Sequence, residues 1–73
     1  MSKADKMFDE LGVTSECLHD NTVLYLYKEG YLDIYLDLEQ KEMAINMSRY
    51  LNNTLQYYLA FNEKLKELGW LDE

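Results

Sequence analysis

The strongest constraint on the fold is an unbroken alternation of aliphatic with polar or aromatic residues over positions 31–39. The aliphatic members are Leu32, Ile34, Leu36 and Leu38, and the residues between them are Tyr31, Asp33, Tyr35, Asp37 and Glu39. A β-strand has a side-chain period of two, so this segment predicts a strand with one aliphatic face and one acidic, tyrosine-rich face. We expect the aliphatic face to form a core, and the acidic face is the candidate for function.

Neighbouring segments predict the rest of a sheet. Residues 22–27 and 43–47 are also rich in aromatic and aliphatic residues, and turn signals separate them from residues 31–39. Together the three segments predict an antiparallel meander, to which residues 14–18 can add a short fourth strand.

The first hairpin decides which side chains share a face. A three-residue loop at positions 28–30, with glycine last, fits a type I turn followed by a bulge and pairs Tyr27 with Tyr31. A two-residue loop would turn Leu24 and Leu26 outward, which exposes aliphatic surface for no gain. We therefore expect the three-residue loop. The predicted binding face then consists of Tyr25, Tyr27, Tyr31, Asp33, Tyr35, Asp37 and Glu39.

Helical spacing marks both ends of the chain. Ser2 and Asp5 resemble a capping box before a short helix that Gly12 ends, and a second helix is predicted over about 54–68. We expect the second helix to pack its apolar stripe on the leucine face and to turn Lys64 toward water. The predicted class is α+β: an N-terminal helix, a three- or four-stranded antiparallel sheet and a C-terminal helix packed on one sheet face. The expected core residues are Leu24, Leu26, Leu32, Ile34, Leu36, Met43, Ile45, Leu55, Leu59, Leu65 and Leu68.

Length and charge limit the classes of function. A chain of 73 residues predicts a single compact domain over residues 1–73, too small for a large internal cleft. Fourteen acidic residues against seven basic ones give a net charge of −7, which repels nucleic-acid phosphates and favours a basic protein as partner. The charged segment 1–10 and the lack of a long apolar run predict a cytoplasmic protein that does not enter a membrane.

The sequence carries no motif for catalysis, a metal or a cofactor. Cys17 and His19 supply at most two ligands where a structural zinc needs four. Asp33 and Asp37 would lie about 13 Å apart along a strand, at ~3.3 Å per residue, which exceeds the separation of paired glycosidase carboxylates. We therefore expect no enzyme, no metal and no cofactor. Two interpretations of the tyrosines stay open: they form an interface, or they pack beneath another part of the chain.

The two ends of the chain resemble those of a known group of small proteins. Residues 2–12, Ser-Lys-Ala-Asp-Lys-Met-Phe-Asp-Glu-Leu-Gly, and residues 60–70, Ala-Phe-Asn-Glu-Lys-Leu-Lys-Glu-Leu-Gly-Trp, are similar to the ends of small proteins encoded by phages and prophages of Gram-positive bacteria. Those proteins commonly have tyrosine where this chain has Val13 and cysteine where it has Leu65, and both changes keep an apolar residue. The resemblance weakens through the strands and brings no catalytic residues.

Phage accessory genes of this size often encode inhibitors of host defence, including anti-CRISPR proteins, many of which are small and acidic and occupy nucleic-acid channels. The resemblance therefore implies a phage-encoded inhibitor that acts in the host cytoplasm. It would bind a basic, nucleic-acid-binding defence nuclease by protein–protein contact, because carboxylates can take the place of phosphate. The alternative is a phage structural or regulatory protein that forms a homodimer through its tyrosine-rich sheet face.

Overall fold

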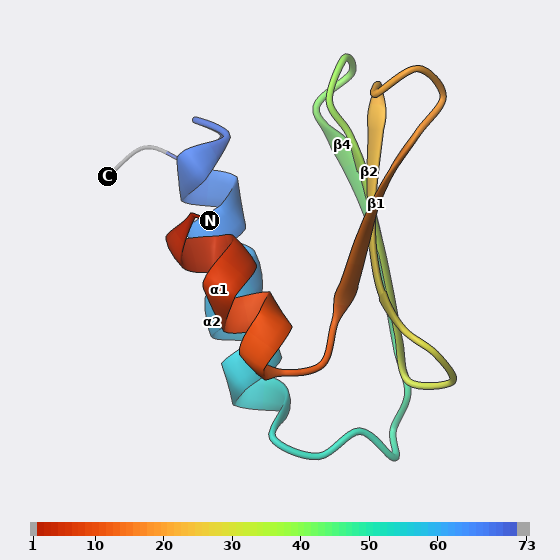
Figure 1. Cartoon of the computed structure of the whole chain (residues 1–73), viewed down its shortest axis with the longest axis vertical. Coiled ribbons are helices and arrows are strands. Elements are labelled where there is room, and N and C mark those ends of the chain that lie inside the picture. The colour runs from red at the N-terminus through yellow and green to blue at the C-terminus, as the bar shows by residue number, and fades with distance from the viewer. Residues whose placement is uncertain (1, 72–73) are drawn as a thin grey trace. The chain divides into compact units, whose positions relative to one another are not determined.

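The computed structural model describes residues 2–71, which form two compact units: residues 2–12 with 52–71, and residues 13–51. The elements over these residues are α1 (Lys3–Glu10), β1 (Thr14–Leu18), β2 (Val23–Lys28), β3 (Leu32–Asp37), β4 (Glu42–Met47) and α2 (Thr54–Glu67) (Figure 1). This order confirms the predicted α+β class, with a helix at each end and the strands between them. Of the two alternatives left open, three strands or four, the structure has four, because residues 14–18 form β1.

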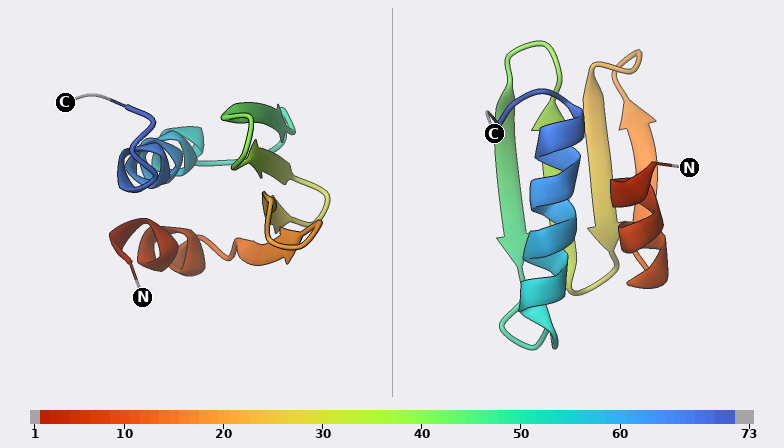
Figure 2. Two further views of the ribbon diagram at one scale, coloured as in Figure 1. Left: turned by 90° about the horizontal axis from the view of Figure 1, so that it is seen from above. Right: turned by 90° about the vertical axis from the view of Figure 1, so that its left-hand side faces the viewer.

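The unit of residues 13–51 is one antiparallel sheet whose strands lie in chain order, as the right-hand view of Figure 2 shows. The expected pairing of Tyr27 with Tyr31 is wrong, because Tyr27 lies opposite Asp33. The reason is the turn: Gly30 takes a φ of +83°, which glycine adopts without strain, and the Tyr31 N–H donates to the Lys28 carbonyl at 2.9 Å. The loop is therefore residues 29–31. The partner of Tyr27 moves by two positions, so the side chains that lie within β2 and β3 keep their expected faces.

One face of the sheet, here called the leucine face, carries the sheet's buried aliphatic residues. It consists of Ser15, Cys17, Leu24, Leu26, Lys28, Leu32, Ile34, Leu36, Met43, Ile45 and Met47. Its fully buried side chains are Leu26, Leu32, Ile34 and Leu36, all on the two central strands. The expected burial of Met43 and Ile45 is wrong, since they are 50% and 39% exposed. Both lie on β4, an edge strand with a sheet neighbour on one side only.

The other unit pairs α1 with α2, which lie side by side in both views of Figure 2. At the start of α1 the Ser2 hydroxyl accepts a hydrogen bond from the Asp5 N–H at 3.1 Å, as a capping residue should. At the end of α2 the Trp70 N–H donates to the Leu65 carbonyl at 2.9 Å, and Gly69 has a positive φ of 76°. These features form a glycine stop at the end of the second helix.

The buried stripe of α2 differs from the expected one. The helix buries Tyr57, Ala60, Phe61, Lys64 and Leu65. Leu55 and Leu59 were expected in the core, and this is wrong because they are 65% and 45% exposed. Tyr57 lies on the inner side instead and donates its hydroxyl to the Leu11 carbonyl of the α1 cap at 3.3 Å. That the helix packs on the leucine face, and that residues 1–73 form a single domain, stay predictions.

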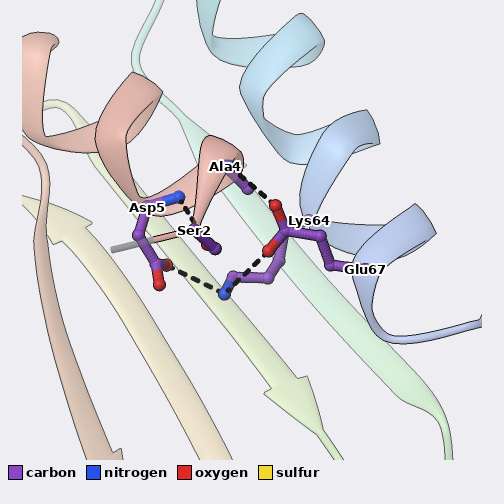
Figure 3. A network of polar contacts seen from close by, with 5 residues as sticks. All are labelled: Ser2, Ala4, Asp5, Lys64 and Glu67. Atoms are coloured by element: carbon purple, nitrogen blue, oxygen red, sulfur yellow. Dashed lines mark hydrogen bonds and ion pairs between the residues drawn. The ribbon is translucent and has the colours of Figure 1, made fainter.

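Lys64 is also placed contrary to expectation, because its side chain is only 11% exposed. Figure 3 shows its ammonium between two carboxylates: Nζ lies 2.9 Å from Asp5 Oδ1 and 3.8 Å from Glu67 Oε1. The second oxygen of Glu67 accepts the Ala4 N–H at 2.8 Å. The hydrogen bond from Lys64 lowers the pKa of Asp5 below its ordinary value. A largely buried lysine is tolerated here because opposite charges on both helices surround it.

Candidate functional site

The second face of the sheet, here called the tyrosine face, holds most of the predicted binding residues. It consists of Thr14, Glu16, Leu18, Val23, Tyr25, Tyr27, Asp33, Tyr35, Asp37, Glu42, Ala44 and Asn46. Of the predicted set, Tyr31 and Glu39 lie outside it. Tyr31 is in the turn between β2 and β3, and Glu39 is in the turn between β3 and β4. The structure thus brings Tyr25, Tyr27, Asp33, Tyr35 and Asp37 together and leaves the other two at opposite ends of β3.

Three tyrosine rings stack at the centre of the tyrosine face. Tyr25 lies between the other two, with its ring centroid 4.6 Å from that of Tyr27 and 4.5 Å from that of Tyr35. The interplanar angles are 18° and 13°, so the rings are nearly parallel. Tyr35 is the direct cross-strand partner of Tyr25, the arrangement in which aromatic pairs stabilise a sheet.

Two of these tyrosines hold carboxylates by crossed hydrogen bonds. The Tyr25 hydroxyl donates to Asp33 Oδ1 at 2.6 Å, and the Tyr27 hydroxyl donates to Glu16 Oε1 at 3.1 Å. Asp33 is the strand partner of Tyr27, and Glu16 is the strand partner of Tyr25, so each ring reaches diagonally past the other. The hydrogen bond that Tyr25 donates to Asp33 raises the pKa of Tyr25, and the one that Tyr27 donates to Glu16 raises the pKa of Tyr27, because a phenolate could not donate to a carboxylate.

The charge of the tyrosine face is of one sign. Its carboxylates are Glu16, Asp33, Asp37 and Glu42, and none of its strand positions within residues 13–51 is lysine or arginine. The hydroxyls that hold Asp33 and Glu16 are neutral, so they orient the carboxylates without cancelling their charge. The sequence analysis missed Glu16 and Glu42, although the alternation of Thr14, Glu16 and Leu18 was a signal for the former.

An open hollow of about 330 Å³ lies at one end of this face. It is lined by Leu18, His19, Val23, Tyr35, Asp37, Glu42, Met43 and Ala44. Its floor is low because Val23 and Ala44 are short side chains beside the large Tyr35. The Asp37 carboxylate at its edge is held in place, since Oδ1 accepts the N–H groups of Glu39 and Gln40, each at 3.0 Å. The hollow combines apolar walls, one aromatic ring and two carboxylates.

The turn between β1 and β2 brings His19 to the edge of the hollow. His19, Asp20 and Asn21 take positive φ values of 50°, 55° and 67°, and these are the non-glycine types that adopt the left-handed region most readily. The Thr22 N–H and hydroxyl both donate to the His19 carbonyl, at 3.1 and 2.7 Å, and close the turn.

No metal-binding group of three or more His, Cys, Asp or Glu side chains is found among residues 2–71. In the same part of the chain, neither helix has the length and apolar character needed to cross a membrane. Comparisons of the chain with protein families, with curated proteins and with solved structures gave no match. What the geometry offers is a rigid surface of aromatic rings and carboxylates, which suits contact with a cationic protein surface.

Proposed function

We propose that this protein is a small phage-encoded inhibitor that binds a nuclease of the host's defence system, in the manner of anti-CRISPR proteins, through protein–protein contact. The tyrosine face would lie in the basic channel that normally holds nucleic acid. Its carboxylates would offer the channel's lysine and arginine side chains the charge they otherwise take from phosphate. The tyrosine rings would supply flat surfaces for guanidinium groups.

The observation that carries this proposal is the uncompensated charge of the tyrosine face. Asp33 and Glu16 are oriented by neutral hydroxyls, and no strand position of the face within residues 13–51 supplies a cation. Fixed charges of one sign around a central aromatic stack are complementary to a positively charged partner. The phage origin is supported by the resemblance of the two chain ends.

The same charge distribution argues against the alternative, a homodimer through this face. A two-fold interface places one surface against its own copy, so the carboxylates of the tyrosine face would meet carboxylates. Like charges across an interface are unfavourable, and no cation of the face would offset them. Sedimentation of the purified protein tests the point, since a dimer that survives in low salt would favour the alternative.

The test of the proposal is capture from host lysate, followed by an activity assay on the captured protein. The immobilised chain should retain a nuclease, and the purified nuclease should lose DNA or RNA cleavage when the chain is added. The double variant Asp33→Lys with Glu42→Lys should weaken inhibition at least about tenfold, because repulsion would replace attraction. The effect of added salt should be smaller for this variant than for the wild type.

A matched control has the same net charge as that variant but leaves the tyrosine face intact. Asp9→Lys with Glu10→Lys changes two exposed residues at the C-terminal end of α1, where lysine is favourable to the helix dipole. This control should inhibit as well as wild type. Equal inhibition by the wild type and the double variant of the tyrosine face would rule that face out as the binding surface.

A further inference from the structure

The hollow at the end of the tyrosine face differs from the rest of that face in having apolar walls as well as charge. We infer that it binds the side chain of one arginine from the basic partner protein, an inference that rests on the proposed function. The hollow would then be the anchor point of the interface, and the crossed tyrosine pairs would form the contact surface beside it. Fully seated side chains of this kind contribute most of the affinity of many interfaces.

The walls of the hollow suit the parts of an arginine side chain. Leu18, Val23 and Ala44 offer apolar surface to its methylene stem. Tyr35 offers a ring over which a guanidinium plane can stack. Asp37 and Glu42 are cross-strand partners on β3 and β4, and their carboxylates can accept its N–H groups.

The two carboxylates are prepared for a cation to different degrees. Asp37 is held by the backbone N–H groups of the turn through Oδ1, which leaves Oδ2 for a ligand. The Glu42 carboxylate makes no ion pair or side-chain hydrogen bond within the described residues, so it has no cation to release first. A planar, forked guanidinium can bridge two such acceptors, whereas a lysine ammonium acts as a single point charge.

The chain's own arginine is not the expected occupant. Arg49 already donates to the Tyr50 hydroxyl at 2.9 Å, and its guanidinium carbon lies 5.0 Å from the centroid of that ring. A second copy would also bring an equally acidic surface to the hollow. The occupant is therefore expected to come from a cationic protein.

The direct test uses capped tripeptides as probes and needs no knowledge of the partner. Acetyl-Gly-Arg-Gly-amide is titrated into ¹⁵N-labelled protein, beside the lysine peptide and the citrulline peptide, which keeps the shape of arginine without its charge. The arginine peptide should shift the amides of residues 18–23, 35–37 and 42–44, and the citrulline peptide should bind about tenfold more weakly. Equal binding of citrulline, or shifts spread evenly over the chain, would overturn the inference.

Two variants locate the site, each with a matched control. Ala44→Leu fills the floor of the hollow and should abolish binding of the arginine peptide. Asn46→Leu adds a similar side chain to the same face and strand outside the hollow and should leave binding unchanged. Should Ala44→Leu lose the folded amide spectrum, Glu42→Gln decides: it should weaken binding severalfold, while Glu29→Gln, in the distant β2–β3 turn, should not.

The outcomes separate this inference from the proposed function. An arginine peptide that binds in the hollow while no nuclease is captured or inhibited would contradict the proposed function and support the arginine site. Nuclease inhibition that survives both Ala44→Leu and Glu42→Gln at full strength would overturn the arginine site and leave the proposed function standing.

Discussion

Two carboxylates of the helix pair lie beside a cation, whereas two of the tyrosine face have neutral hydroxyls as partners. Between α1 and α2, Asp5 and Glu67 lie against the ammonium of Lys64. On the sheet, Asp33 and Glu16 accept hydrogen bonds from neutral tyrosine hydroxyls. The first arrangement offsets part of its charge internally, since one ammonium faces two carboxylates, and the second orients its charge and leaves it in place.

The surroundings of each carboxylate decide where the net charge of −7 can act on another molecule. Acidic residues that already hold a lysine contribute to folding and have little charge left to offer. Those held by hydroxyls are fixed in direction and still attract a cation. Total charge alone does not distinguish the two kinds of carboxylate, but their nearest partners do.

We expect the largest loss of stability when the cation is removed from the helix pair. Lys64→Met keeps a long apolar stem but leaves Asp5 and Glu67 facing each other, so the free energy of unfolding should fall by about 1 to 3 kcal/mol. Urea denaturation followed by circular dichroism measures the change. Lys6→Met, at an exposed position of α1, is the control and should cost less than about 0.5 kcal/mol. Equal losses of unfolding free energy in the two variants would show that Lys64 contributes no more to stability than an exposed lysine.

The acid side of the stability profile should depend on the same lysine. Lys64 lowers the pKa of Asp5, so the folded protein binds fewer protons at this carboxylate than the unfolded chain does at the same pH. The stability that Asp5 adds is present above its unfolded pKa of about 3.9 and is lost as pH falls through the lower folded pKa. The wild type should therefore lose more stability than Lys64→Met between about pH 5 and pH 2. Parallel profiles for the two proteins would contradict the pairing.

The alkaline side should report on the tyrosine face instead. The pKa values of Tyr25 and Tyr27 are raised in the folded protein, so their contribution is present below the unfolded pKa of about 10 and is lost at higher pH. The difference in absorbance at 295 nm between wild type and Tyr25→Phe with Tyr27→Phe isolates these two groups. Their ionisation should begin above pH 10 in the folded protein. Ionisation at the ordinary tyrosine pKa would show that the hydroxyls do not hold Asp33 and Glu16.

We expect the smallest change in stability at Glu42, which differs from Lys64 in having no opposite charge among the strand positions of its face within residues 13–51. Glu42→Gln removes a charge from the tyrosine face where no cation compensates it, so stability should change by less than about 0.5 kcal/mol. Removal of like-charge repulsion can even make the change favourable. A loss above 1 kcal/mol in urea denaturation would mean that Glu42 has a structural partner, and the division between the two kinds of carboxylate would fail.

The sheet could be predicted from the sequence because its pattern tolerates error. The hairpin loop was placed one residue too early, but the partner of Tyr27 moved by an even number of positions, and a period of two is unchanged by such a shift. Ile34 and Leu36 are therefore buried as expected, while Tyr35 faces the other side. The predicted burial of edge positions such as Met43 was wrong, because alternation indicates the face of a side chain and not its distance from the centre of the sheet.

The helix pair and the details of the site could not be predicted in the same way. Residues 55–61 of α2 are almost all apolar or aromatic, so helical spacing could not decide between Leu55 and Tyr57 for the inner side. The burial of Lys64 depends on Asp5, which is far away in the sequence. The crossed bond from Tyr25 to Asp33 likewise requires the true register of β2 and β3, which the expected loop did not give.

The stacked and crossed tyrosines have a consequence for the entropy of binding. Tyr25 is held at its ring by two neighbours and at its hydroxyl by Asp33. Tyr27 is held at its ring by Tyr25 and at its hydroxyl by Glu16. Their rotamers are restricted before any partner arrives. Ordering a flexible side chain at an interface costs about 0.5 to 1.5 kcal/mol, and for these two residues most of that cost falls on folding instead of on association. The tyrosine face is thus preorganised, and its affinity for a partner should be higher than that of the same residues on a mobile loop.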